Sequence, residues 1–402
     1  MSSTYTASAS ARPTDHDTDR REMKKNVLVM VSPVSAARIA GIARYAREHG
    51  WHLMIQDRLG HRPLAWNGDG IVATLRSDAK TVETIRKLTK RGIPVVDLTM
   101  SRPDIRVPRV TSDHVGIGRL AAEHFRERNF RNVVWFSVGW GNVHKLRYSG
   151  LAESMPAERW VAEDALPKSR RNDWDSFARW IERKLKEAPK PLAALTYDEA
   201  DAARLLDAAE RIGTSVPEEL AILSIGNASI ICENQSVPLS SIDQNLELGG
   251  YEAAALLDRL MNGGTAPKSP VLVPPGGICL RRSTDIVASG DPVVKRVLDY
   301  IAEHIATPFG AAQIADALGA SRNVLDKRFR ADLNRSIGTE ILRQRIALAK
   351  ILLRNSDATV AEIAKCTGFC TPSHLSNAFR EATGAPPRAW RMSAGNVSPS
   401  GT

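Results

Sequence analysis

Two stretches near the end of the chain resemble each other: AAQIADALGASRNVLDKRFRADLNRSIG at 311–338 and VAEIAKCTGFCTPSHLSNAFREATGAPP at 360–387. Each predicts a short helix that buries Ile and Ala, a glycine that takes a left-handed turn, and a second helix that buries Leu and Phe four residues apart. The repeat is typical of two helix–turn–helix units. Its matched positions are Ile314-Ala315 with Ile363-Ala364, Gly319 with Gly368, Leu325 with Leu375, and Phe329 with Phe379.

The helix starts carry capping signals. Thr359 with Glu362 has the spacing of a capping box, Thr371 precedes a proline at the first helical position, and Ser321 is a plausible N-cap. Between the units, RQRIALAKILLR at 343–354 predicts a long amphipathic helix that could hold the two units rigidly. Two such readers about one DNA turn apart, roughly 34 Å, could enter successive major grooves.

The outward faces of the two second helices are predicted to meet DNA. Arg and Lys suit guanine, Asn suits adenine, and Ser can serve either base. The acid among them, Asp326, could accept from a cytosine amine or pair with Arg330, and the ion pair is the favoured interpretation. The candidate DNA-binding residues are Arg322, Asn323, Asp326, Lys327, Ser373, His374, Ser376, Asn377 and Arg380.

Tandem units joined by R-x3-A-x2-L-L from Arg345, and followed by P-x2-W-R from Pro387, resemble the AraC/XylS DNA-binding domain. The resemblance covers residues 291–392 and implies an all-α domain that binds double-stranded promoter DNA. Two positions depart from the family. Trp390 stands where Tyr or Phe is usual, and Cys370-Thr371-Pro372 replaces a polar stretch.

Positive charge is concentrated in this helical region. The chain has 402 residues and a net charge of +10, and residues 291–402 hold 15 basic and 10 acidic residues, a net +5. We therefore expect a salt-sensitive phosphate-binding surface beside the first reader. Its basic residues are Arg322, Lys327, Arg328, Arg330, Arg335, Arg343 and Arg345.

Composition excludes several classes of protein. With 43% hydrophobic and 25% charged residues the chain is neither fibrous nor disordered, and four scattered cysteines make no disulfide scaffold. Cys366 and Cys370 lack zinc-ligand spacing, so we expect them in the core. No apolar run approaches the roughly 20 residues that span a bilayer, and residues 1–23 lack the apolar stretch of a secretory signal. We expect a cytoplasmic protein without a membrane partner, with disordered tails at 1–23 and 393–402.

From Asn26 to about Asp285, short β-branched runs such as VLVMV at 27–31 alternate with helical stretches. This alternation predicts βαβ units and a parallel sheet. About 260 residues exceed one sheet layer, so we expect two similar α/β lobes within residues 24–288. Helix follows helix from Asp291, which places the domain boundary near 289–292.

Several segments of this part resemble the LacI/GalR-type effector domain, which is periplasmic-binding-protein-like. They are VTSDHVGIGRLAAEHF at 110–125, the strand, helix and VPEEL turn at 195–228, and the strand–helix return from 238. RRSTD at 281–285 resembles the end of that domain in the xylose-operon regulators, which fuse it to an AraC-type C-terminus. The resemblance implies an α/β fold class: a two-lobe periplasmic-binding-protein-like effector domain followed by an all-α tandem helix–turn–helix domain.

Small molecules bind such domains in the crevice between the lobes, at the carboxyl ends of the strands. Carboxylates and a guanidinium suit sugar hydroxyls there, although an Asp at a strand end can instead be a helix cap. One position departs: Gly226 precedes Asn227 where the family usually has Asp, so the ligand differs from xylose or the pocket is weakened. The candidate effector-binding residues are Ser35, Asp113, Arg147, Asp198 and Asn227; the resemblance carries over Asp113, Arg147 and Asp198.

The alternative is a small-molecule-binding protein or α/β enzyme with a helical appendage. GWG at 139–141 lacks the third glycine of a dinucleotide loop, and nothing in the spacing joins Ser137, His144 and Asp113 into a triad. We therefore predict a non-enzymatic transcriptional regulator without cofactor or metal. Its partners would be promoter DNA, a pentose-like effector and a second copy of the chain, with RNA polymerase as a further candidate. The effector, the operator, and the choice between activation and repression stay open.

Overall fold

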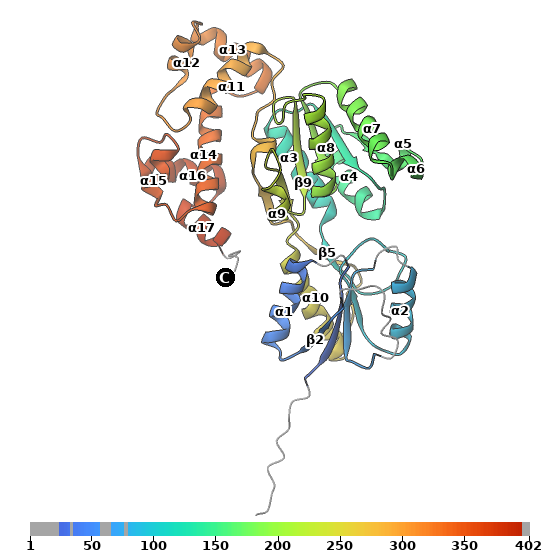
Figure 1. Cartoon of the computed structure of the whole chain (residues 1–402). Helices are drawn as coiled ribbons and strands as arrows, with labels where there is room; N and C mark the ends of the chain where they lie inside the picture. The colour runs from blue at the N-terminus through green and yellow to red at the C-terminus, as the bar shows by residue number, and fades with distance from the viewer. Residues whose placement is uncertain (1–23, 33–34, 57–65, 76–78, 396–402) are drawn as a thin grey trace, which may run out of the picture. The chain divides into compact units, whose positions relative to one another are not determined.

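The structure, a computed structural model, describes residues 24–32, 35–56, 66–75 and 79–395. The predicted tail at 1–23 lies outside the described residues, as does the predicted tail at 393–402 apart from residues 393–395. The chain falls into two compact units (Figure 1). The first consists of residues up to 111 together with 247–271, and the second of 112–246 together with 272 onward. The chain therefore crosses between the units three times.

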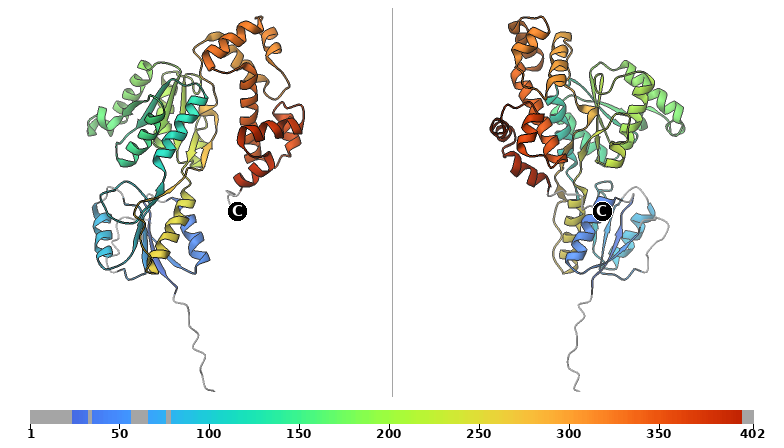
Figure 2. Two further views of the ribbon diagram at one scale, coloured as in Figure 1. Left: turned by 180° about the vertical axis from the view of Figure 1, so that it is seen from behind. Right: turned by 60° about the vertical axis from the view of Figure 1, so that its left-hand side comes forward.

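The first unit is a parallel sheet with helices on both faces. Its strand order is β2-β1-β3-β4, and α1 and α10 cover one face while α2 covers the other (Figures 1 and 2). Both faces are buried, because neighbouring residues of β1 such as Leu28 and Val29 are equally inaccessible. The elements are β1 Asn26–Met30, α1 Ala36–Glu48, β2 His52–Ile55, β3 Gly70–Ala73, α2 Ala79–Lys90, β4 Val95–Asp97 and α10 Leu246–Met261.

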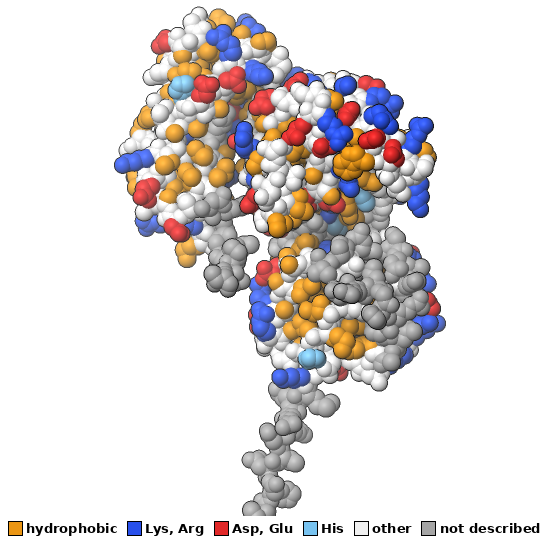
Figure 3. Space-filling model, in the orientation of Figure 1, with side chains coloured by type: hydrophobic (Ala, Val, Ile, Leu, Met, Phe, Trp, Pro, Cys, Tyr) orange, Lys and Arg blue, Asp and Glu red, His pale blue; other side chains and the backbone are white. Residues whose placement is uncertain are grey.

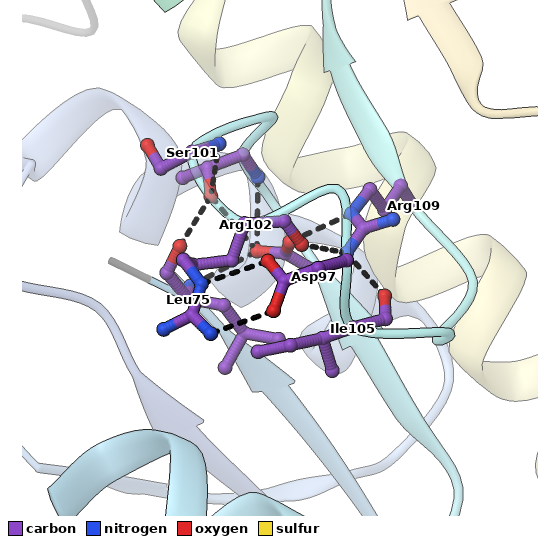
Figure 4. Close-up of polar contacts among 8 residues, drawn as sticks. Leu75, Asp97, Ser101, Arg102, Ile105 and Arg109 are labelled. Carbon is purple, nitrogen blue, oxygen red and sulfur yellow. Dashed lines mark hydrogen bonds and ion pairs between the residues drawn. The ribbon is translucent and has the colours of Figure 1, made fainter. Parts of the chain in front are cut away.

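A buried ion pair holds the loop that follows β4 (Figure 4). Arg109 Nε donates to Asp97 Oδ2 at 2.9 Å, and the two side chains are 8% and 0% exposed. Asp97 Oδ1 accepts from the backbone N–H of Leu75, while Arg109 donates to the carbonyl oxygens of Arg102 and Ile105. Burial raises the pKa of Asp97, and these hydrogen bonds and the guanidinium oppose that rise. Because both charged groups are satisfied internally, the pair fixes the loop.

The second unit contains a six-stranded sheet in the order β12-β10-β9-β8-β6-β7. Its neighbours are parallel except for β10 and β12, which are antiparallel. Helices α3 and α4 build one core on the sheet, and α7 and α8 build another on the opposite face. The main elements are α3 His114–Glu127, β6 Asn132–Ser137, α4 Asn142–Ser154, β7 Glu158–Val161, α7 Trp174–Glu187, β8 Leu192–Thr196, α8 Glu199–Arg211, β9 Leu220–Ile225, β10 Ser240–Asp243 and β12 Gly277–Cys279.

Short elements complete this unit and its connections to the first. They include a two-stranded sheet of β5 and β11, which lies where the chain crosses between the units. The predicted pair of similar α/β lobes is confirmed, since each unit holds a mainly parallel sheet covered by helices. These elements are β5 Val110–Ser112, α5 Ala162–Ala165, α6 Lys168–Arg171, α9 Ser229–Cys232, β11 Val271–Val273 and a 3-10 helix at Arg282–Thr284.

The remainder is helical, as predicted. Asp291 caps the first of these helices and Pro292 occupies its first position, close to the predicted boundary. The last helix reaches Gly395, three residues beyond the predicted domain end at 392. No described helix combines the length and the apolar character needed to cross a bilayer. The helices are α11 Pro292–His304, α12 Ala311–Ala317, α13 Arg322–Leu333, α14 Ile337–Asn355, α15 Val360–Cys366, α16 Pro372–Thr383 and α17 Pro387–Gly395.

Two helix pairs cross with their backbones in contact at glycines. A Cβ atom on Gly118 of α3 would lie 2.1 Å from the carbonyl oxygen of Arg147, and one on Gly150 of α4 would lie 2.0 Å from a carbonyl oxygen of α3. In the first unit, Gly41 of α1 and Gly250 of α10 meet in the same way. Glycine inside a helix lowers stability by about 1 kcal/mol relative to alanine. Glycine at these positions is therefore favourable only because it lets the two helices approach closely.

The variant Gly150→Ala should therefore destabilise the second unit, although alanine favours helix formation. A methyl group cannot overlap a carbonyl oxygen, so α3 and α4 must separate, and overpacking of this kind costs roughly 1–3 kcal/mol. Chemical denaturation followed by tryptophan fluorescence measures the change. Gly290→Ala is the control, since a Cβ atom there meets open space. Equal stability of the two variants would contradict the packing described.

Candidate effector site and DNA interface

Three of the five predicted effector residues cap helices. Ser35 caps α1 in the first unit, while Asp113 and Asp198 cap α3 and α8 in the second. Each side-chain oxygen accepts a hydrogen bond from a backbone N–H one turn on, at 3.4, 2.8 and 2.9 Å respectively. A cap uses one carboxylate oxygen, so both Asp side chains keep a second acceptor oxygen.

Arg147 is buried and reaches the carboxyl end of β8. Its guanidinium donates to the carbonyl oxygen of Tyr197 at 2.7 Å and to Oε1 of Gln244 at 2.6 Å. It also lies over the Tyr197 ring, 4.8 Å from the centroid. Burial lowers the pKa of Arg147 from its ordinary value, and the neighbouring Asp198 opposes that shift. The structure thus brings Arg147 beside the residues that follow β8.

Aromatic side chains line the same strand ends. The His144 ring stacks on Tyr197 with centroids 3.9 Å apart, and Arg159 lies 4.4 Å over the ring of Trp140. Ser137 donates to the carbonyl oxygen of Gly139 at 2.9 Å. The three groups considered for a triad are therefore used separately: Asp113 caps a helix, His144 stacks on an aromatic ring and Ser137 bonds to the backbone.

The loop after β9 contains Gly226, the position at which this sequence departs from the family pattern. Gly226 and Asn227 have φ of +142° and +59°, in the region that favours glycine and tolerates asparagine. The Asn227 backbone N–H donates to Oγ of Ser241 at 3.0 Å, and its Oδ1 accepts from Arg281 at 3.2 and 3.3 Å. Arg281 also forms an ion pair with Glu233 at 3.2 Å. The Asn227 oxygen is thus already engaged inside the protein.

Acidic side chains crowd the first turn of α8. Asp198, Glu199 and Asp201 lie there, where unpaired backbone N–H groups favour negative charge. Burial and the neighbouring Asp198 nevertheless raise the pKa of Asp201 to about 7, against the pull of Arg204. Arg147, Asp198 and Asn227 converge on the ends of β8 and β9, while Ser35 belongs to the first unit. Sequence reasoning missed Glu199, Tyr197 and Gln244, although Tyr197 and Glu199 flank the predicted Asp198.

In the second helix of each helix–turn–helix unit, the residues predicted to face inward are buried, and most of those predicted to face outward are exposed. Leu325 and Phe329 of α13, and Leu375 and Phe379 of α16, are buried, and Gly319 and Gly368 take the predicted left-handed turns. The predicted capping box and the Thr371 cap are present, whereas the Ser321 side chain makes no capping hydrogen bond. Of the nine candidate readers, the exposed ones are Arg322, Asn323, Lys327, Ser373, His374, Asn377 and Arg380, while Asp326 and Ser376 are half-buried.

Asp326 pairs within its own helix, but the predicted partner is wrong. Its Oδ2 lies 3.9 Å from Nε of Arg322, one turn before it rather than one turn after. Ser376 donates to the carbonyl oxygen of Pro372, which occupies its hydroxyl hydrogen. Val324 is 52% exposed on the reading face, an apolar group suited to a thymine methyl that the sequence reasoning missed.

Arg345, the first residue of the family motif on α14, joins the loop before the first helix–turn–helix unit to the second unit. Its Nη2 donates to the carbonyl oxygen of Thr307 at 2.7 Å. The guanidinium lies 5.2 Å from the ring centroid of Phe309 and 6.0 Å from that of Phe369. Thr307 and Phe309 precede α12, whereas Phe369 follows α15, so one side chain contacts both the loop before the first helix–turn–helix unit and the turn of the second.

The predicted basic surface is smaller than its seven residues suggested. Arg335 and Arg343 both bind the carboxylate of Glu340, which is fully buried. Arg328 forms two hydrogen bonds of 2.8 Å with Asp291. On the face drawn in Figure 3, basic side chains of the helical domain are scattered among acidic and apolar ones. With Arg345 also engaged, the exposed residues left from the seven are Lys327 and Arg330, together with Arg322, which lies 3.9 Å from Asp326.

The expectation for two cysteines is wrong. Cys366 and Cys370 are exposed, not in the core. Cys366 is the last residue of α15, after the buried Ile363 and Ala364, and Cys370 lies in the turn before α16. No group of three or more potential metal ligands gathers among the residues that the structure describes.

Comparisons with known proteins match both parts of the chain. Residues 122–284 match the periplasmic binding protein-like domain, and residues 314–393 match a helix-turn-helix domain. The xylose operon regulatory protein of Haemophilus influenzae is 26% identical over 375 residues, which cover 88% of this chain and 94% of that protein. Its Escherichia coli K12 counterpart is 25% identical, over 88% and 92% of the two chains.

Solved structures support the fold. The structure of a xylose-binding transcription activator, xylR, aligns over 92% of this chain and 99% of that chain with a TM-score of 0.58 and 22% identity. A CelR–cellobiose complex aligns over 64% of this chain and 84% of that chain with a TM-score of 0.51 and 21% identity. The chain is therefore similar to the xylose operon regulatory proteins over 88% of its length, and it contains matches to a periplasmic binding protein-like domain and a helix-turn-helix domain.

Proposed function

We propose that this homologue of the xylose operon regulatory proteins is a transcriptional regulator that binds promoter DNA through its helical domain and a sugar through its α/β domain. The observation that carries the proposal is the pair of helix–turn–helix units with equivalent exposed faces, attached to a periplasmic-binding-protein-like domain. A regulator of this kind works on the chromosome, so we assign it to the cytoplasm and assign it no reaction.

DNA recognition is proposed to divide between positioning and base reading. The exposed Lys327 and Asn377 stand at matched positions of α13 and α16, and their groups suit guanine and adenine. Arg330 and Arg380, also matched and exposed, suit phosphate contacts. Helix α14 runs between the two units, and we propose that it holds the two readers at the spacing of two successive major grooves.

The effector is proposed to be a pentose or a related sugar. Relatives named for xylose support this class, and the polar groups after β8 and β9 supply charge-assisted hydrogen bonds to hydroxyls. Binding would favour one arrangement of the domains and so change operator affinity.

A homodimer is proposed as the active form. Ile230 and Ile231 of α9 are 79% and 38% exposed, next to the buried Cys232. Adjacent exposed isoleucines are costly in water and are typical of contact surfaces. We assign this surface to a second copy of the chain, whose two helical domains would then occupy paired operator sites.

Lys327→Ala and Asn377→Ala should each weaken specific operator binding by roughly 10- to 100-fold, the range expected for one lost base contact. Gel shifts on promoter fragments from neighbouring genes, at physiological salt, measure the change. Lys295→Ala on α11 is the control, because it removes an exposed lysine outside the reading helices. Unchanged affinity in both reader variants would remove these residues as base readers.

D-xylose or a related pentose should raise the melting temperature and change the amount of DNA bound. At 100 times Kd the ligand adds about 2.7 kcal/mol to stability. Asp198→Asn should reduce this shift, because asparagine caps a helix as well as aspartate but carries no charge. Arg183→Ala, an exposed position on α7, is the control. A sugar response of Asp198→Asn equal to that of the wild type would exclude a ligand role for this carboxylate.

Ile230→Asp should convert the dimer to a monomer, because a charge on a buried contact surface is strongly unfavourable. Sedimentation velocity measures the oligomeric state across protein concentrations. Trp174→Asp supplies a matched control at another exposed apolar residue, 57% accessible on α7. A dimer that survives the Ile230 change would place the interface elsewhere.

A further inference from the structure

The space above Gly226 is filled by the carboxylate of Glu199. A Cβ atom built on Gly226 would lie 2.5 Å from Glu199 Oε1 and 2.6 Å from Oε2, which is closer than real atoms approach. Glu199 is the first residue of α8, immediately after the Asp198 cap, and its side chain is buried apart from 7% of its surface. A carboxylate therefore stands at the end of β9, but it comes from α8.

Within the described part of the chain, a single oxygen of this carboxylate is engaged. Oε1 accepts from the backbone N–H of Ala228 at 3.0 Å and from Oγ of Ser241 at 3.4 Å. Among the described residues Oε2 has no hydrogen-bond partner, and it is not one of the fully buried unsatisfied atoms. An ionised carboxylate is an acceptor at both oxygens, so Oε2 keeps its lone pairs for another donor.

A hydrogen-bond donor lies on Asn227, the residue after Gly226. Arg281 engages Oδ1 of Asn227, which orients the amide and leaves Nδ2 without a partner among the described residues. The backbone N–H of Asn227 is anchored to Ser241, the same side chain that touches Glu199. The loop therefore presents one acceptor, Glu199 Oε2, and one donor, Asn227 Nδ2, held by a shared set of contacts.

A hydroxyl group both donates and accepts hydrogen bonds, so an acceptor and a donor held by shared contacts suit a ligand that carries hydroxyl groups. We infer that Glu199, in place of a side chain at position 226, supplies the carboxylate that accepts from a hydroxyl of a polyhydroxylated, sugar-like effector, with Asn227 donating to the same ligand. This inference rests on the proposed function and names residues of the same site. The arrangement requires glycine at position 226, since any side chain there would displace the Glu199 carboxylate.

A purely structural Glu199 predicts a different outcome. In that case the carboxylate only ties Ala228 and Ser241 together, and its loss lowers the stability of the free protein without a separate effect on ligand affinity. Glu199→Gln distinguishes the two roles, because the amide oxygen still accepts from Ala228 while the negative charge and the second acceptor are lost.

The test measures the Kd of D-xylose, L-arabinose and D-ribose by calorimetry, together with the melting temperature of the free protein. Glu199→Gln should weaken binding of the sugar that the wild type prefers by about 10- to 100-fold, the value of a hydrogen bond to a charged group. Its melting temperature without sugar should stay close to that of the wild type. Glu187→Gln, an exposed position at the end of α7, is the matched control and should change neither quantity.

A second pair of variants keeps the test decisive if Glu199→Gln folds poorly. Glu199→Ala with Gly226→Asp returns a carboxylate to the end of β9, whereas Glu199→Ala with Gly226→Ala carries the same backbone strain without one. The aspartate pair should bind the sugar about tenfold more tightly than the alanine pair. Equal affinity of the two pairs would overturn the inference.

Failure of the inference and failure of the proposed function give different results. If the wild type binds a sugar and Glu199→Gln binds it equally well, only the role of Glu199 falls. If the wild type binds none of the three sugars, the proposed effector class falls and the inference falls with it.

Discussion

Direct contact between helix backbones, which only glycine permits, is the constraint on which both α/β units depend. In the first unit it joins α1 to α10, two segments about two hundred residues apart in the chain. In the second it joins α3 to α4 at Gly118 and Gly150, and the atom that meets Gly118 is the carbonyl oxygen of Arg147. The helix that carries the buried guanidinium is therefore fixed by the absence of a methyl group on its neighbour.

The candidate effector site shows how capping and binding can share the same side chains. A helix cap needs one oxygen of a carboxylate, and the dipole of the helix favours the negative charge that remains. Asp113 and Asp198 are positioned in this way by local hydrogen bonds. Arg147 and Asn227 are instead positioned by partners from other segments, Gln244 and Arg281. Local caps thus position the aspartates of the candidate site, and partners from distant segments orient Arg147 and Asn227.

In the helical domain, several charged side chains form ion pairs inside the protein and are therefore not available to DNA. Glu340 is fully buried and binds Arg335 and Arg343, so removal of Glu340 would leave two partly buried guanidinium groups without their carboxylate partner. Arg345 contacts the loop before the first helix–turn–helix unit and the turn of the second. The positive excess of this region therefore overstates the charge available to phosphates, which lies on a few exposed side chains of α13 and α16.

The sequence by itself determined the alternation of strands and helices, the paired helix–turn–helix units and the faces of their second helices. These follow from periodicity and from capping residues, which act within a few positions along the chain. It could not determine which atoms lie next to each other across segments. The tertiary structure decided that most of the predicted basic surface is internally paired, that Cys366 and Cys370 are exposed, and that the Glu199 carboxylate fills the space above Gly226. A side chain's partner is chosen by segments that meet only when the chain folds, so composition and spacing carry no record of it.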